Sequence, residues 1–197
     1  MIAHTHIKSL LVCYHGQSRV LCALEMRSRV RWQDISEIHV ESYGAAVRMM
    51  GSDATRETAD HSMPYVVAKA FMDGKLTSKS FAPERLTDPT VRDLMHKVKV
   101  SESAELSLQY PEGAPGRLRV RTVSGEVLVE EVRYPKGHAR IPMNDNDVEQ
   151  KFRDMFQAHG DARQCAAALQ MLRRFEHVTD VKSGMIELFA IRSGAAD

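Results

Sequence analysis

Residues 116–134 read GRLRVRTVSGEVLVEEVRY, and polar and apolar side chains alternate along them with a period of two. Ser124-Gly125 interrupts this alternation near its middle, where a tight turn favours glycine. The pattern predicts a β-hairpin with one packed face and one face in water. The wet face carries three arginines that we expect to pair across the strands with glutamates: Arg117, Arg119, Arg121, Glu126, Glu130 and Glu131.

Helical spacing of apolar residues replaces this alternation on both sides of the hairpin. The helices expected on this ground lie at 16–29, 64–72, 89–98, 146–156 and 162–178. Typical start and stop signals mark three of these helices. A histidine, a serine and a proline precede helix 64–72, and Asp73-Gly74 ends it. Asp88-Pro89 begins helix 89–98, and a capping box of Asn146 with Glu149 begins helix 146–156. Residues 183–191 read as a short apolar helix or strand.

Two further stretches read as strands, ISEIHVESY at 35–43 and the pair Leu106 and Leu108, while 44–58 reads as a loop of uncertain form. Strands and helices are partly segregated along the chain, which favours the α+β class over a doubly wound sheet. We expect a small antiparallel sheet packed by helices over residues 1–145. Residues 146–197 follow as a C-terminal helical segment.

Composition narrows the class of protein. A length of 197 residues suits one large or two small domains, and 43% hydrophobic residues can fill a core. The formal net charge of +1 gives no electrostatic reason to expect nucleic acid or a membrane as partner. No apolar run approaches the ~20 residues that span a bilayer. Three cysteines without CxxC spacing predict no disulfide framework and a reducing, cytoplasmic setting.

The segment KSLLVCYHGQS, residues 8–18, gathers polar side chains at the start of the first expected helix. A helix start offers main-chain N–H groups and a positive dipole end, which suit a carboxylate. Lys8 would add a full charge, and His15 titrates near neutral pH. The alternative is structural: Gln17 or Ser18 caps the helix, and His15 bonds a loop carbonyl. Short motifs match by chance often enough to favour this alternative.

A second candidate is ADHSMPY, residues 59–65, ahead of the second expected helix. A cap explains Ser62 and Pro64 without any function. It does not explain why His61 and Tyr65 accompany them, and a helix start that lines a pocket would.

Two weaker candidates remain. YPKGHAR, residues 134–140, reads as an anion-binding loop or, more simply, as a solvated connection. His4, His6, Cys13 and His15 together do not have the spacing of a structural zinc site, so no metal site is expected. No phosphate-binding loop, dinucleotide-binding glycine motif or nucleophile elbow occurs.

The segments CYHGQS, WQDISEIHVESYG, RETADHSMPYVVAKAFMDG, FAPERLTDP and YPKGHARIPM occur in this order. In this arrangement the chain resembles the C-terminal half of the MmgE/PrpD family, from about Ile7 to about Phe156. The resemblance implies an α+β lid domain beside a larger helical domain, with the active site in the cleft between them. It implies lyase or epimerase chemistry on small polycarboxylates, without metal or cofactor, in a homodimer.

The same resemblance implies roles for individual residues. Lys8 corresponds to a lysine of the cleft and would hold a substrate carboxylate. His15 would shuttle a proton or donate a hydrogen bond, and His61 would orient or contact the substrate. These three are the expected catalytic residues. The expected substrate-binding residues beside them are Gln17, Ser18 and Ser62.

Departures from the family pattern limit these expectations. The helical N-terminal half has no counterpart here, the loop before His61 is shorter than usual, and Ile141 replaces a polar residue that is often asparagine. We therefore expect a partial protein with little activity alone, forming a homodimer or completing a helical partner. The alternative is a non-enzymatic interaction module that oligomerises through its C-terminal helices, whose apolar stripes comprise Phe152, Met155, Phe156, Leu169, Leu172 and Phe175.

Overall fold

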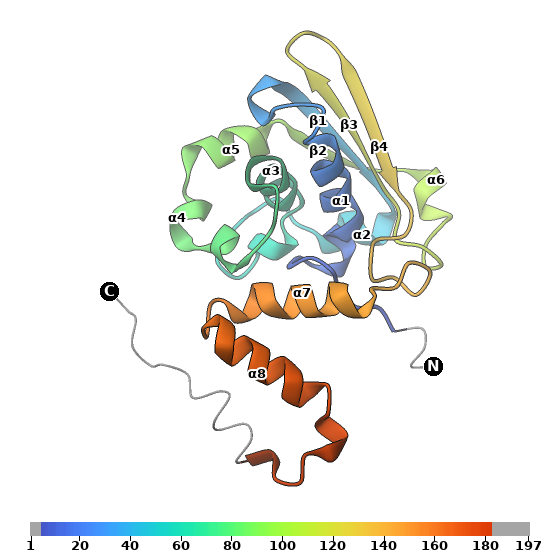
Figure 1. Ribbon diagram of the computed structural model, residues 1–197. Coiled ribbons are helices and arrows are strands. Elements are labelled where there is room, and N and C mark those ends of the chain that lie inside the picture. The colour runs from blue at the N-terminus through green and yellow to red at the C-terminus, as the bar shows by residue number, and fades with distance from the viewer. Residues whose placement is uncertain (1–4, 183–197) are drawn as a thin grey trace. The chain divides into compact units, whose positions relative to one another are not determined.

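The hairpin of residues 116–134 forms half of a four-stranded sheet with strand order β2-β1-β3-β4 (Figure 1). The strands are β1 (Ile35–Ser42), β2 (Val98–Glu102), β3 (Gly116–Thr122) and β4 (Val127–Val132). β1–β3 and β3–β4 pair antiparallel, whereas β1 and β2 pair parallel, with Ile38 opposite Val98. The α+β class is confirmed, and the sheet is mixed where the sequence predicted an antiparallel one. The structure, a computed structural model, describes residues 5–182.

One face of the sheet is covered by α1 (Gln17–Met26) and α3 (Met63–Asp73), which also contact each other (Figure 1). The core between them consists of inward-facing apolar side chains, among them Val20, Met26, Ile38, Val40, Val66, Leu118 and Val120. Leu118 and Val120 are alternate positions of the hairpin, as the period of two predicted, so its packed face is confirmed.

The opposite face of the sheet is charged, as the alternation predicted. Arg117 bonds Glu131 across the β3–β4 pair, at 2.6 Å, which confirms one expected cross-strand pair. Arg119 instead bonds Glu41 of β1 at 3.0 Å. Glu130 lies opposite Leu118, on the helix-covered face of the sheet, and bonds Arg29 there. The expectation named only the neighbouring strand of the hairpin, whereas β3 lies between two strands and has partners on both sides.

The signals at the ends of α3 are confirmed. Ser62 is the N-cap and accepts a hydrogen bond from the amide of Tyr65, and Pro64 lies in the first turn. Gly74 ends the helix with φ of +70°, a conformation that costs glycine little. The cap reading of this segment is therefore correct, and it leaves His61 and Tyr65 to be explained.

Shorter helices complete the unit: α2 (Gly44–Met49), α4 (Pro83–Leu86), α5 (Pro89–His96) and α6 (Ala104–Ser107). Asp88 caps α5 as predicted. Two predictions were wrong here. Val98 begins β2 and does not belong to the helix face. Leu106 lies in α6 and is buried, while Leu108 is 89% exposed, so their alternation reflects a helical turn and not a strand.

The chain divides into two units, residues 1–143 and 144–197. The second contains α7 (Asp145–Phe156) and α8 (Ala162–Leu172). The capping box of α7 is formed by Asn144 and Asp147. The prediction of Asn146 and Glu149 was wrong, because it placed the helix start two residues too far along the chain. Residues 183–191, expected to form a short helix or strand, lie outside the described residues.

The apolar residues of this second unit fall into two sets. Phe152, Phe156, Cys165 and Leu169 pack together between α7 and α8. Met155, Leu172 and Phe175 are between 41% and 52% exposed. Only the second set matches the expectation of an apolar stripe left for another surface. Within residues 5–182, none of the helices combines the length and the apolar character that a bilayer crossing requires.

Candidate functional site

The two segments singled out from the sequence meet in space. The main-chain N–H of Cys13 donates a 3.1 Å hydrogen bond to the carbonyl oxygen of Asp60, joining the turn before α1 to the turn before α3. His15 and His61 follow these two bonded residues by two positions and one position. They lie within electrostatic reach, because the charge of His61 contributes to lowering the pKa of His15. Two of the three expected catalytic residues therefore share one region.

His15 is half-buried and bonded to a tyrosine that the sequence did not single out. Its Nδ1 lies 2.7 Å from the hydroxyl of Tyr43, the residue that follows β1. Tyr43 is fully buried, and its ring stacks on that of Tyr110 with a centroid distance of 4.4 Å. Burial, then the charges of Arg19 and His61, lower the pKa of His15 below its ordinary value, so the imidazole is neutral at pH 7.

Tyr43 in turn keeps its proton. Burial raises the pKa of this phenol to about 12, although Arg19 opposes the rise. The hydroxyl of Tyr43 can therefore donate to Nδ1 of His15 when that nitrogen carries no proton. The proton of neutral His15 is then on Nε2. The pair therefore holds His15 neutral, with Nε2–H as its accessible group.

Arg19 is a second residue that the sequence analysis missed. It is completely buried and lies 4.8 Å from the centroid of the Tyr43 ring, within cation–π range. One guanidinium nitrogen, Nη1, donates to the carbonyl oxygen of His15 at 2.6 Å. The other, Nη2, donates to the hydroxyl of Ser42 and to the carbonyl oxygen of Pro115.

No carboxylate pairs with Arg19 within residues 5–182. Burial lowers the pKa of Arg19, but a guanidinium stays protonated at neutral pH. The turn that carries His15 thus holds a positive charge that no acidic side chain of the described chain neutralises. Such a charge favours an anionic ligand.

His61 stands on an exposed turn and is oriented by its neighbour. Its Nδ1 lies 2.8 Å from a carboxylate oxygen of Asp60, and about half of the imidazole surface is exposed. This bond engages Nδ1, so Nε2 is the nitrogen available for a further contact.

Lys8 lies on an exposed segment that is attached to a third loop. The amide of the preceding residue, Ile7, donates to the carbonyl oxygen of Gly137 at 2.9 Å. The ring of His6 lies 4.2 Å from the ring of His138, which is buried, and burial followed by His6 lowers the pKa of His138. The loop of residues 134–140 therefore anchors the segment that carries Lys8, a role that neither reading of YPKGHAR anticipated.

The three expected substrate-binding residues are all buried and engaged within the chain. Gln17 donates to the carbonyl oxygens of Leu10 and Val12 and accepts from the amide of Leu10. Ser18 donates to the carbonyl oxygen of Ala114. Ser62 donates to that of Ser52 at 3.0 Å while it caps α3. A substrate contact by these side chains stays a prediction, and each would have to exchange an existing hydrogen bond for it.

Metal ligands do not assemble in the part of the chain that the structure describes. Among residues 5–182, no three side chains of His, Cys, Asp or Glu come together where they would hold a metal ion. His4, one of the four side chains considered for zinc, lies outside that range.

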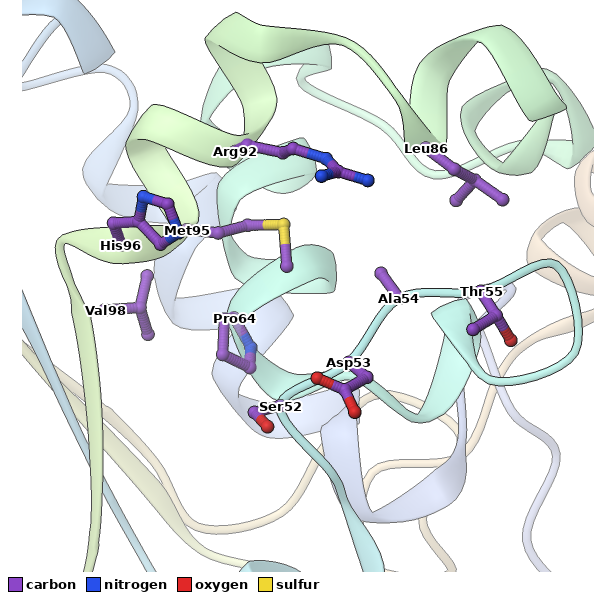
Figure 2. Close-up of a pocket in the computed structure, with 10 residues that line it drawn as sticks. All are labelled: Ser52, Asp53, Ala54, Thr55, Pro64, Leu86, Arg92, Met95, His96 and Val98. Carbon is purple, nitrogen blue, oxygen red and sulfur yellow. The ribbon is translucent and has the colours of Figure 1, made fainter.

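A cavity of about 570 Å³ opens beside α5, and none of the six expected site residues lines it (Figure 2). Its lining comprises Ser52, Asp53, Ala54, Thr55, Pro64, Leu86, Arg92, Met95, His96 and Val98. The six expected site residues therefore lie outside the lining of this cavity.

Comparison with known proteins accounts for the segments that carry these side chains. Residues 12–177 match the MmgE/PrpD C-terminal domain. The chain belongs to the MmgE/PrpD family. The match includes His15, Tyr43, His61 and His138, and begins four residues after Lys8.

Curated relatives within the family are enzymes of small carboxylates by name. The chain is 26% identical to 2-methylcitrate dehydratase of Cupriavidus necator over 140 residues, which is 64% of this chain and 29% of that protein. It is 30% identical to the mitochondrial 2-methylcitrate dehydratase of Yarrowia lipolytica over 140 residues, 64% of this chain and 26% of the relative. It is 29% identical to cis-aconitate decarboxylase of Mus musculus over 101 residues, which is 48% of this chain and 19% of that protein. The chain thus spans less than a third of the length of these relatives.

Proposed function

We propose that this chain supplies one wall of the active site of a lyase or isomerase that acts on small polycarboxylates. In this proposal Lys8, His15 and His61 contact the substrate, and Gln17, Ser18 and Ser62 border it. The chemistry named for the relatives supports the substrate class, and the short span of the match makes the whole reaction part of the proposal.

The observation that carries the proposal is the bond between Cys13 and Asp60. It holds a neutral, half-buried His15 close to an exposed His61 that is paired with Asp60. The unneutralised charge of Arg19 lies behind them, and Lys8 is exposed on a neighbouring anchored segment. A neutral imidazole with a buried positive charge nearby suits an anion from which a proton is to be removed.

The proposed reaction begins with removal of a proton next to a carboxylate of the substrate. The proton of neutral His15 first moves from Nε2 to Nδ1, which then donates to the hydroxyl oxygen of Tyr43, and the freed Nε2 accepts the substrate proton. Lys8 pairs with a carboxylate and stabilises the negative charge that develops. His61, oriented by Asp60, holds a second polar group. Loss of water or carbon dioxide, or return of a proton, completes the class of reaction.

A wall alone gives little catalysis, because proton abstraction needs a closed site from which water is excluded. We therefore propose that residues 1–145 act as a lid-type domain and that residues 146–197 pack on a helical domain that these residues do not themselves provide. The proposed partner of the chain is either a second copy of itself or a helical domain. The free cysteines Cys13, Cys22 and Cys165 support a reducing, cytoplasmic location.

Histidine resonances test the proposal directly. Titration of the chain with tricarballylate, a tricarboxylate without reactive groups, should shift the ring signals of His15 and His61 saturably, with a Kd on the order of 1 mM. Lys8→Gln should weaken this binding, whereas Lys75→Gln, which changes another exposed lysine, should not. Trimethyl tricarballylate should not bind. Absence of saturable shifts at His15 and His61 would refute the proposed site.

The exposed side chains of Met155, Leu172 and Phe175 favour one alternative, a non-enzymatic module that oligomerises through its C-terminal helices. Burial of such side chains stabilises by ~1.5–3 kcal/mol each. Sedimentation equilibrium distinguishes the two functions when combined with the titration. A self-associating chain that ignores tricarballylate supports the module, and a chain that binds it supports the enzyme.

A further inference from the structure

The cavity of about 570 Å³ beside α5 has two walls of opposite charge (Figure 2). One wall is α5, which contributes Arg92, Met95 and His96. The other is the loop of residues 52–55, which contributes Asp53. Between them Figure 2 shows an open space, with Arg92 above it and Asp53 below it in this view.

Neither charged side chain is used inside the described chain. Within residues 5–182, no hydrogen bond or ion pair engages the guanidinium of Arg92 or the carboxylate of Asp53. Other arginines of the same unit are paired, including Arg29, Arg117 and Arg140. Both Arg92 and Asp53 are exposed. An accessible cation and an accessible anion therefore face one hollow without neutralising each other.

Apolar side chains form the surface between the two charges. Met95 reaches into the space from α5, and Leu86 points into it from the end of α4 (Figure 2). Pro64, buried in the first turn of α3, and Val98 complete this surface. The cavity volume falls in the range typical of small-molecule sites, ~300–1,000 Å³.

We propose that this cavity binds an apolar α-amino acid as a zwitterion. The carboxylate of the ligand pairs with the guanidinium of Arg92, whose planar fork matches it in two hydrogen bonds. The ammonium group pairs with Asp53. The aliphatic side chain lies on Met95, Leu86, Pro64 and Val98. This assignment explains why two opposite charges stand apart across an apolar surface, and it does not depend on the proposed lyase or isomerase activity.

Three probes with the same isobutyl group test the assignment by calorimetry. Leucine carries both charges, 4-methylpentanoate lacks the ammonium group, and 3-methylbutylamine lacks the carboxylate. Leucine should bind about tenfold or more tighter than either probe, as expected for charge-assisted hydrogen bonds.

Two variants should change this ranking in opposite ways. Arg92→Gln should weaken leucine by about tenfold or more and leave 3-methylbutylamine unchanged. Asp53→Asn should weaken leucine but not 4-methylpentanoate, because the probe has no ammonium group and the repelling carboxylate is gone. The matched controls are Arg163→Gln and Asp93→Asn, which remove exposed charges outside the cavity. Both should bind leucine as the unaltered chain does.

A measurement on the unaltered chain tests the proposal even if a variant fails to fold. The methyl signal of Met95 should shift when leucine is added to the unaltered chain. The proposal is overturned by the absence of saturable leucine binding, by equal affinity for the three probes, by leucine binding that Arg92→Gln leaves unchanged, or by a Met95 methyl that does not respond.

Discussion

The Nδ1 atom of His15 lies 2.7 Å from the hydroxyl oxygen of Tyr43, so the turn before α1 is bonded to the end of β1. Because Tyr43 holds its proton up to a pKa of about 12, its hydroxyl is a donor at neutral pH. When this hydroxyl donates to Nδ1, the proton of neutral His15 is on Nε2.

Tyr43→Phe removes this donor and retains the ring that stacks on Tyr110. We expect the Nε2–H form of His15 to dominate at pH 7.5 in the unaltered chain, and both forms to be populated in the variant. The loss of one hydrogen bond should reduce the free energy of unfolding by about 1 kcal/mol. The ¹⁵N shifts of the His15 ring report the two forms. Tyr110→Phe is the control and should leave them unchanged, while an unchanged His15 in Tyr43→Phe would contradict the assignment.

Arg19→Met tests the buried guanidinium. The substitution keeps an unbranched side chain but leaves the carbonyl oxygens of His15 and Pro115 and the hydroxyl of Ser42 without this donor. At ~1–3 kcal/mol for an unsatisfied buried group, we expect the free energy of unfolding to fall by about 3 kcal/mol or more. The pKa of His15 should also rise, since the charge of Arg19 helps to lower it.

Chemical denaturation and a histidine titration measure these two effects. Arg121→Met serves as the control, because Arg121 is exposed on the wet face of β3. A surface change of this kind should alter the free energy of unfolding by no more than ~0.5 kcal/mol. Equal stability of the two variants would show that Arg19 does not organise this turn.

The sequence predicted correctly those elements whose structure depends on a few neighbouring residues. The hairpin follows from alternation around Ser124-Gly125, and α3 is bounded by Ser62 and Gly74, whose roles as cap and terminator depend on a few neighbouring residues. The β2 strand was missed because its five residues follow directly on α5, and Val98 fits the apolar face of that helix as well as it fits a strand. Val98 belongs to a strand because β2 pairs with β1, sixty residues earlier in the chain.

The same distinction applies to the candidate site. The sequence alone indicated Lys8, His15 and His61 as candidates, because each lies in a short segment with several polar side chains. Tyr43 and Arg19 lie inside an ordinary strand and helix pattern, and no local feature separates them from core residues. Their proximity to His15 results from the packing of α1 on the sheet, which brings Ser42, Tyr43 and Pro115 around one guanidinium.

Gly137→Ala should detach the segment that carries Lys8. Gly137 has φ of +89°, and a Cβ atom added there would lie 1.8 Å from the carbonyl oxygen of Ile7. The hydrogen bond from the Ile7 amide to Gly137 cannot survive this contact. We expect faster hydrogen exchange at Ile7 and faster tryptic cleavage after Lys8.

Gly125→Ala is a close control for this change. Gly125 also has φ of +89°, but nothing lies within 4 Å of an added Cβ. It should incur only the backbone penalty, ~1–2 kcal/mol, and leave exchange at Ile7 unaltered. If both variants leave Ile7 equally protected, the loop of residues 134–140 does not anchor Lys8.

The buried ring of His138 should make stability depend on pH in a defined window. Its pKa is lowered by burial, then by His6 and Arg140, while Glu112 acts in the opposite direction. A lowered pKa means that the unfolded chain binds more protons than the folded one. The contribution of His138 to stability is therefore complete above its unfolded pKa, about 6.5, and is lost as the pH falls below that value.

His138→Asn should flatten this dependence. The amide oxygen of asparagine can replace Nδ1 as acceptor for the Arg140 amide, and asparagine binds no proton in this range. Between pH 7.5 and 5, the unaltered chain should lose free energy of unfolding more steeply than the variant. The difference is at most ~1.4 kcal/mol per pH unit, the limit for one proton. Denaturation curves at several pH values measure it, with the exposed His159→Asn as control. Parallel curves for the unaltered chain and His138→Asn would mean that His138 accepts a proton as readily when folded as when unfolded.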